Sequence, residues 1–192
     1  MNSSRNSDLI LSVFSDTRTV FSLNDIAMLI GESDFKKLNE RLNYYIRKGK
    51  LLRPRKGIYV KPNYNPKELA CMLYTPSYIS LEYVLQKAGV VFQYDERITA
   101  VSYLSRSVDV EKHTYTYRKI KGEILIVTQG INQTGNVNIA MPERAFLDIL
   151  YLDATYYFDN LNPLDKNLIT KLLPIYNSKT LTARVKKMLA NG

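Results

Sequence analysis

Basic side chains gathered in one stretch are the part of this sequence best suited to chemistry with another molecule. Residues 36–61 hold ten Lys and Arg side chains and a single acid, Glu40, whereas residues 62–192 hold 15 basic and 12 acidic side chains. Positive charge at this density indicates a polyanionic partner, and nucleic acid is the usual one. The alternative is a solvated charged face, which normally carries interspersed Asp and Glu. The candidate DNA-contacting residues are Lys36, Lys37, Arg41, Tyr44, Arg47, Lys48, Arg53, Arg55 and Lys56.

Side chains suited to catalysis are scarce. The chain has one histidine, His113, and one cysteine, Cys71, too few for a cluster of imidazole or thiolate metal ligands. Gly130 and Gly135 have the spacing of a phosphate-binding loop, but Asn136-Val137 stands where that loop needs Lys-Ser/Thr. We expect His113 to be a half-buried structural residue and Cys71 to lie in the core. The sequence therefore predicts a protein that is not an enzyme, with no catalytic residue, metal or cofactor.

Length and composition are those of a folded protein with a substantial core. The 192 residues are 45% hydrophobic and 23% charged, and a chain of this size buries roughly 70% of the surface that its unfolded form exposes. No run of residues approaches the ~20 apolar residues of a membrane span. The apolar run 9–14 is too short for a signal peptide. We therefore expect a cytoplasmic protein with no membrane partner.

Two helices must position the basic side chains. Ser22 and Asp25 have the spacing of a capping box, which begins a helix that Gly31 ends. Ser33 is expected to cap the next helix, which Gly49 ends. The apolar side chains of this second helix fall on one arc, namely Phe35, Leu38, Leu42, Tyr45 and Ile46. The opposite arc carries Lys36, Lys37, Glu40, Tyr44, Arg47 and Lys48, with Arg41 on its flank.

A charged hairpin is expected directly after these helices. The β-prone runs 51–53 and 58–60 surround Pro54-Arg55-Lys56-Gly57. Because Pro54 has no N–H for a ladder, this ribbon should be a free edge. With an earlier helix around residues 9–14, the segment has the three helices and the hairpin of a winged helix-turn-helix DNA-binding domain. We place that domain at residues 1–62.

The remaining residues, 66–192, predict a second domain of the α+β class. Strand patterns at 97–104, 113–119, 124–127 and 136–141 do not alternate strictly with helices, which favours an antiparallel sheet. Helices are expected at 66–74, 80–88, 142–152, 163–173 and 178–189, the last three forming a C-terminal group. Arg144 and Asp148 lie four apart on one of these helices and should form an ordinary ion pair.

Four short motifs stand out along the chain: FSLND at 21–25, RPRKGIYV at 53–60, YISLEYVL at 78–85 and MPERAFLD at 141–148. Together they resemble the AbiEi antitoxin family of type IV (abortive infection) toxin–antitoxin modules, over residues 15–155. The resemblance implies an N-terminal winged helix that represses the protein's own operon by binding double-stranded promoter DNA. It also implies a C-terminal antitoxin domain that counteracts a nucleotidyltransferase-like toxin without a stable complex between the two proteins.

The resemblance also assigns roles to the candidate DNA contacts. Lys36, Lys37, Arg41 and Tyr44 would belong to the recognition helix, and Arg53, Arg55 and Lys56 to the wing. We expect Arg55 and Lys56 to contact phosphates, and Lys37 and Arg41 to face base edges. Glu40 departs from an all-basic surface. It either accepts a hydrogen bond from a cytosine amine or pairs with Lys36 or Lys37, and the pairing is favoured.

Two other functions fit the sequence. The protein could be a winged-helix transcriptional regulator whose second domain senses a ligand. Less consistent with the sequence is a nucleic-acid-modifying enzyme, since no metal or nucleophile constellation accompanies the basic stretch. A neighbouring gene for a nucleotidyltransferase-like toxin would favour the antitoxin hypothesis over both.

Overall fold

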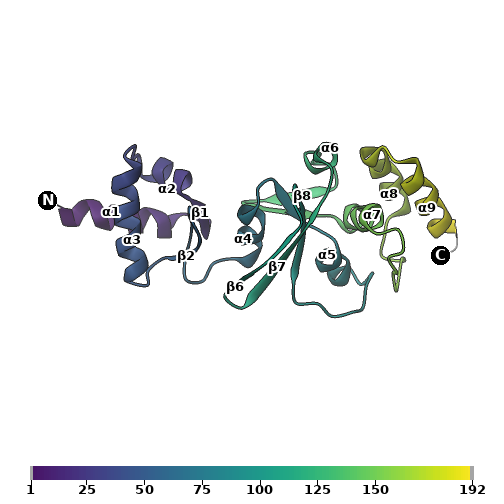
Figure 1. Ribbon diagram of the computed structural model, residues 1–192, viewed down its shortest axis with the longest axis horizontal. Coiled ribbons are helices and arrows are strands. Elements are labelled where there is room, and N and C mark those ends of the chain that lie inside the picture. Colours follow the sequence, from purple (N-terminus) through teal and green to yellow (C-terminus); the bar gives the residue numbers. More distant parts are fainter. Residues whose placement is uncertain (1, 191–192) are drawn as a thin grey trace. The chain divides into compact units, whose positions relative to one another are not determined.

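The chain folds into two compact units, an N-terminal unit of residues Met1–Leu73 and a C-terminal unit of residues Tyr74–Gly192. The computed structural model describes residues 2–190 (Figure 1). Side chains are described for residues 9–190. Helices and strands of both units follow the α+β class that the sequence predicts. The division lies further along the chain than the expected link at 62–66, so the helix that follows the link belongs to the N-terminal unit.

Three helices and a small antiparallel sheet open the N-terminal unit, and a fourth helix closes it. The helices are α1 (Asn2–Ser15), α2 (Leu23–Ile30), α3 (Phe35–Arg47) and α4 (Pro66–Leu73). The strands are β1 (Val20–Ser22), β2 (Leu52–Arg55) and β3 (Ile58–Val60), in the order β1-β3-β2. Strand β2, which contains Pro54, is therefore an edge strand, as the proline predicts.

Local capping signals account for the ends of α2 and the start of α3. Ser22 and Asp25 form the predicted capping box, and Gly31 ends α2 in the left-handed conformation at φ 64°. The cap of α3 is Asp34 rather than Ser33, because the Asp34 carboxylate accepts the backbone N–H groups of Lys36 and Lys37. A carboxylate here also meets the positive end of the helix dipole.

One apolar core holds the three helices and the sheet of the N-terminal unit together. Its buried members are Leu9, Val13, Phe21, Ile26, Ala27, Leu38, Leu42, Tyr45, Leu51 and Tyr59. Phe35 was expected among them, but it is 45% exposed because it occupies the first position of α3, beyond the end of this core. The buried side of α3 fixes which of its residues face outward.

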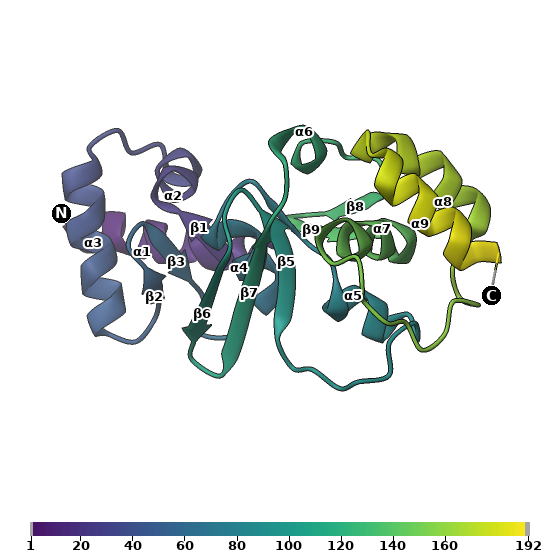
Figure 2. The same cartoon turned by 45° about the vertical axis from the view of Figure 1, so that its right-hand side comes forward.

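A six-stranded mixed sheet forms the centre of the C-terminal unit (Figure 2). Its strands are β4 (Ser77–Ile79), β5 (Ile98–Ser102), β6 (Arg106–Val110), β7 (His113–Lys119), β8 (Ile131–Thr134) and β9 (Val137–Ala140). They lie in the order β6-β7-β5-β4-β9-β8. The expected antiparallel sheet is corrected here, because β5 pairs with β7 and β4 pairs with β9 in parallel.

Helices pack around this sheet and follow it at the C-terminal end. They are α5 (Glu82–Lys87), α6 (Gly122–Leu125), α7 (Pro142–Leu152), α8 (Lys166–Leu172), the 3-10 helix η1 (Leu173–Tyr176) and α9 (Lys179–Ala190). Helix α5 contacts β5 and α7, and α7 contacts β9 and α8. No helix among residues 2–190 is long and apolar enough to span a membrane.

The strand expected at 124–127 is wrong. Residues 122–125 form α6 instead, with Ile124 and Leu125 buried. An apolar run of four residues carries too little periodicity to separate a strand from a helical turn. The segment instead leads into β8, one of the four strands that the sequence did not predict.

Candidate nucleic-acid interface

Helix α3 presents a cationic face to solvent. Its buried side is formed by Leu38, Leu42 and Tyr45. Tyr44 is 44% exposed on the outward side, and the Lys48 ammonium lies 5.9 Å from the centre of the Tyr44 ring. The predicted contact residues exposed on this helix are Lys36, Lys37, Tyr44, Arg47 and Lys48. Amphipathicity thus places all but one of the α3 candidates where a ligand can reach them.

Arg41 is the exception, and the reason is Glu32. The Glu32 Oε2 atom lies 3.8 Å from Arg41 Nη1 and 3.8 Å from Lys37 Nζ. The Arg41 side chain is only 16% exposed, whereas that of Lys37 is 51% exposed. Glu32 precedes α3 in the chain and holds the flank of the helix. The structure therefore places Arg41 on the flank of α3, as the sequence predicts, but holds its side chain against Glu32 and not toward the position expected for base edges.

The turn between β2 and β3 brings the three remaining candidates to the surface. Arg53, Arg55 and Lys56 are all exposed. Arg53 Nη1 donates to the Asn43 side chain of α3 at 3.1 Å, which ties the strand to the helix. Arg55 Nη1 donates to the backbone carbonyl of Leu73. Lys56 lies at the tip of the turn, next to Gly57 at φ 81°.

A side-chain contact fixes the orientation of α3 relative to the sheet. The Tyr59 hydroxyl of β3 donates to Asn39 Oδ1 at 2.8 Å, and Asn39 Nδ2 donates to the Phe35 carbonyl at 2.9 Å. Tyr59 is buried in the core. The cationic face of α3 and the cationic turn are therefore held together by Asn39 and by Asn43, a pair of polar residues that the sequence did not single out.

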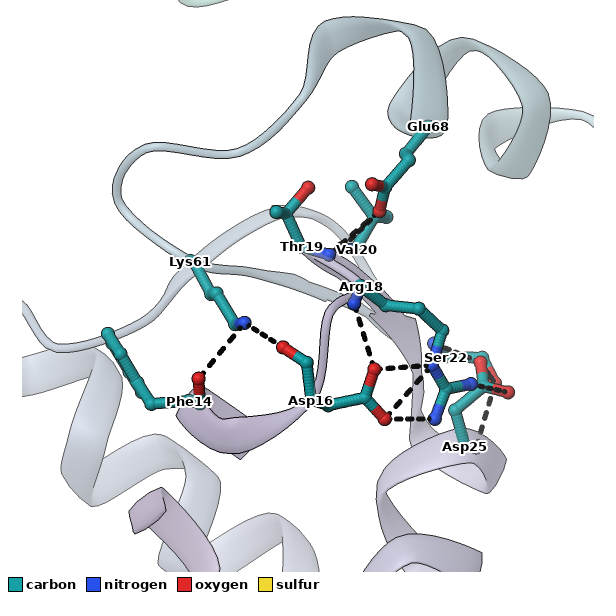
Figure 3. A network of polar contacts seen from close by, with 9 residues as sticks. All are labelled: Phe14, Asp16, Arg18, Thr19, Val20, Ser22, Asp25, Lys61 and Glu68. Atoms are coloured by element: carbon teal, nitrogen blue, oxygen red, sulfur yellow. Dashed lines mark hydrogen bonds and ion pairs between the residues drawn. The ribbon is translucent and has the colours of Figure 1, made fainter. Parts of the chain in front are cut away.

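Glu68 supports strand β1 from helix α4. Its Oε2 atom accepts the backbone N–H groups of Thr19 at 2.8 Å and Val20 at 3.1 Å (Figure 3). Glu68 is buried, with 8% of its surface exposed. Because a buried N–H without a partner is costly, this carboxylate is part of what holds the N-terminal unit. Helix α4 belongs with that unit for this reason.

Arg18 links the segment after α1 to the start of α2. Its guanidinium donates to both Asp16 carboxylate oxygens, with Nη2 2.7 Å from Oδ2, and its Nη1 lies 3.4 Å from Asp25 Oδ1 (Figure 3). The hydrogen bond from Arg18 lowers the pKa of the Asp16 carboxyl from its ordinary value. Lys61, counted in the basic stretch, donates to the Asp16 carbonyl at 2.6 Å. Arg18 and Lys61 thus stabilise the N-terminal unit through these contacts.

The two C-terminal motifs meet at a buried ion pair. Arg144 and Asp148, both fully buried, lie 3.4 Å apart, from Nε to Oδ1. The hydroxyl groups of Tyr78 and Ser80, which come from the first motif, donate to the two Asp148 oxygens at 3.1 and 2.7 Å. The Tyr176 hydroxyl donates to Oδ1 at 2.7 Å. The expected ordinary ion pair is therefore the centre of an internal network.

The remaining Arg144 donors hold the segment before β8. Nη1 donates to the carbonyls of Gln129 at 2.9 Å and Val127 at 3.4 Å, and Nη2 donates to Ile124 at 2.8 Å and to Tyr78 at 2.9 Å. With the bond to Asp148, every N–H of the guanidinium has an acceptor. Burial raises the pKa of the Tyr78 phenol far above its usual range, so this hydroxyl stays protonated. This network therefore holds α7 and the segment before β8 in place within the C-terminal unit.

His113 and Cys71 lie where the sequence predicts. Cys71 is buried, and His113 is half-buried with its ring 6.3 Å from that of Tyr115. His113 and Lys112 line an open cavity of about 610 Å³ with Tyr83 and Tyr94. Within the described part of the chain, no three His, Cys, Asp or Glu side chains lie close enough to hold a metal ion.

Comparisons with known proteins find a structure with a similar fold but no matching family. No family model matches the chain, and no curated protein matches it. The crystal structure of the RV2827C protein from Mycobacterium tuberculosis superposes with a TM-score of 0.57 at 12% identity, over 97% of this chain and 76% of that one. At this identity the likeness is one of fold alone.

Proposed function

We propose that the protein is a DNA-binding repressor that acts through a winged helix in its N-terminal unit. The observation that carries this proposal is the cationic surface formed by the outward face of α3 and the β2–β3 turn. Lys36, Arg47, Lys48 and Lys56 are exposed there, and none of their side chains is paired with a carboxylate among residues 9–190. Unpaired cations on a helix of 13 residues beside a hairpin suit a major groove flanked by phosphates.

The test of this function is binding to the DNA upstream of the protein's own gene. Footprinting with the full chain should protect one discrete site, and a reporter driven by that upstream DNA should be repressed when the protein is expressed. The variant R47A/K48A should lose both effects while its circular dichroism spectrum stays that of the wild type. Uniform coverage of the fragment, with no repression, would contradict the proposal.

We further propose that the C-terminal unit is an antitoxin domain that counteracts a nucleotidyltransferase-like toxin and is not itself an enzyme. The support is the resemblance of its two motifs, whose members Tyr78, Ser80, Arg144 and Asp148 share one buried network. Such a network suits a domain that presents a rigid surface. Co-expression with the neighbouring gene tests this role. Growth should be rescued by the full chain and remain arrested with a chain that lacks the C-terminal unit.

One observation favours a ligand-sensing regulator as the second candidate. The cavity lined by Tyr83, Tyr94, Lys112 and His113 has a volume of about 610 Å³, which is in the size range of small-molecule pockets. Repression that is relieved by a metabolite in cells without the neighbouring gene would support this candidate over the antitoxin.

A further inference from the structure

Glu40 is an acid on the cationic face of α3. It is exposed, as are Lys36 one turn before it and Tyr44 one turn after it. Each of these neighbours is four residues away, which corresponds to about 6 Å along the helix axis. Any DNA that lies against Lys36 and Arg47 therefore also lies against Glu40.

The pairing expected for Glu40 does not occur. Lys37 is turned to Glu32, at 3.8 Å, and Glu40 forms no ion pair with Lys36 or any other side chain among residues 9–190. Its carboxylate is free to accept hydrogen bonds. An unpaired acid facing a phosphate-lined groove weakens binding to every DNA sequence by repulsion, unless a base compensates for it.

The two side-chain amides near this face are occupied. Asn39 accepts from Tyr59, and Asn43 accepts from Arg53. A carboxylate accepts only, and the exocyclic amine of cytosine is the donor that Glu reads in the major groove. We infer that Glu40 reads a cytosine, and so sets the sequence preference of α3. This inference rests on the proposed function, because it requires that α3 enter the major groove.

Selection from a random duplex library measures this preference at one salt concentration. The wild-type chain should select a site with a cytosine at one position, and Glu40→Ala should lose that preference. The expected loss is roughly 5- to 150-fold in affinity for the selected site, the discrimination that one good base contact gives. Affinity of Glu40→Ala for random DNA should stay equal or rise, since a repulsive charge is gone.

Two further variants sharpen the result. Glu40→Gln keeps the length of the side chain, and its amide suits adenine, so the preferred base at that position should change from cytosine to adenine. Glu123→Gln removes the same charge from an exposed position on α6 of the C-terminal unit. This control should select the wild-type site.

The outcomes separate this inference from the proposed function. If the wild-type chain selects a site and Glu40→Ala selects the same site with the same stringency, Glu40 reads no base and the inference is wrong, while the proposed function stands. If the wild-type chain selects no site, both are wrong. Loss of the cytosine preference in Glu40→Ala and its change to adenine in Glu40→Gln, with the wild-type site kept by Glu123→Gln, support the inference.

Discussion

Removing the Arg144 side chain should destabilise the C-terminal unit more than most single substitutions can. The guanidinium is fully buried and donates to Asp148, to the Tyr78 hydroxyl and to three backbone carbonyls. In Arg144→Met the hydrophobic stem is kept, but Asp148 becomes a buried carboxylate without its cation. The three carbonyls of residues 124–129 lose their donor as well.

The expected cost follows from these contacts. Breaking a buried ion pair by removing one partner costs about 3–5 kcal/mol, which is a large part of the 5–15 kcal/mol that stabilises a typical domain. Arg144→Lys should recover only part of this, because an ammonium has three donors and cannot match the planar fork. In Arg144→Met combined with Asp148→Leu neither charge of this pair remains, so the double variant should lose less stability than the two single changes added together.

Urea unfolding followed by circular dichroism measures these differences, since the chain has no tryptophan. The comparison is made on the full-length protein, with the transition of the C-terminal unit as the readout. A loss below about 1 kcal/mol for Arg144→Met, the range of an exposed pair, would refute the buried network. Strict additivity in the double variant would refute the coupling of Arg144 to Asp148.

Four more predictions concern contacts that stabilise the two units. Asp16→Asn removes a carboxyl whose pKa Arg18 lowers, so the wild type should be more stable than this variant at neutral pH. That difference should shrink as the pH falls from about 4 through the lowered pKa of Asp16, and urea midpoints across pH measure it. Glu68→Ala leaves the backbone N–H groups of Thr19 and Val20 without an acceptor and should cost about 2–4 kcal/mol. For the same reason a fragment of residues 1–73 should fold, whereas one of residues 1–63, which lacks Glu68, should be unfolded by circular dichroism. Gly130→Ala should lower the melting temperature, because Gly130 has φ 74° and an added Cβ would lie 3.1 Å from the Arg144 Cβ and 2.9 Å from a Leu172 methyl.

Signals confined to a few neighbouring residues could be predicted from the sequence. The capping box of Ser22 and Asp25, the end of α2 at Gly31 and the bounds of α7 and β7 all depend on contacts within one or two turns or on a clear period. The sequence did not predict strands β1, β4, β6 and β8. Strands β1 and β4 have three residues each and pair with strands far along the chain. Strands β6 and β8 pair with the next strand but are mostly exposed, so few apolar residues mark them.

The candidate interface divides in the same way. Helical periodicity predicts which face of α3 carries the cations. It does not predict the ion pair between Glu32 and Arg41, because this contact depends on how the turn before α3 folds back. The sequence does carry a signal for the burial of Arg144 and Asp148. The helix around them is apolar on every side, with Ala145, Phe146, Leu147, Ile149 and Leu150, and such a helix is typically buried.

The most direct test of the central claim is a salt titration of DNA binding with two matched variants. Fluorescence anisotropy of a labelled mixed-sequence duplex gives the slope of log affinity against log salt concentration. The variant K36A/R47A/K48A/K56A removes unpaired cations from the candidate interface. The variant K171A/K179A/K186A/K187A removes as many exposed lysines from α8 and α9 of the C-terminal unit.

If the outward face of α3 and the β2–β3 turn bind DNA, the first variant should lower the magnitude of the slope by about 3.6, or about 0.9 for each lost phosphate contact. The second variant should keep the slope of the wild type. Equal losses in the two variants would mean that binding follows net charge and not this surface, and that result would contradict the account.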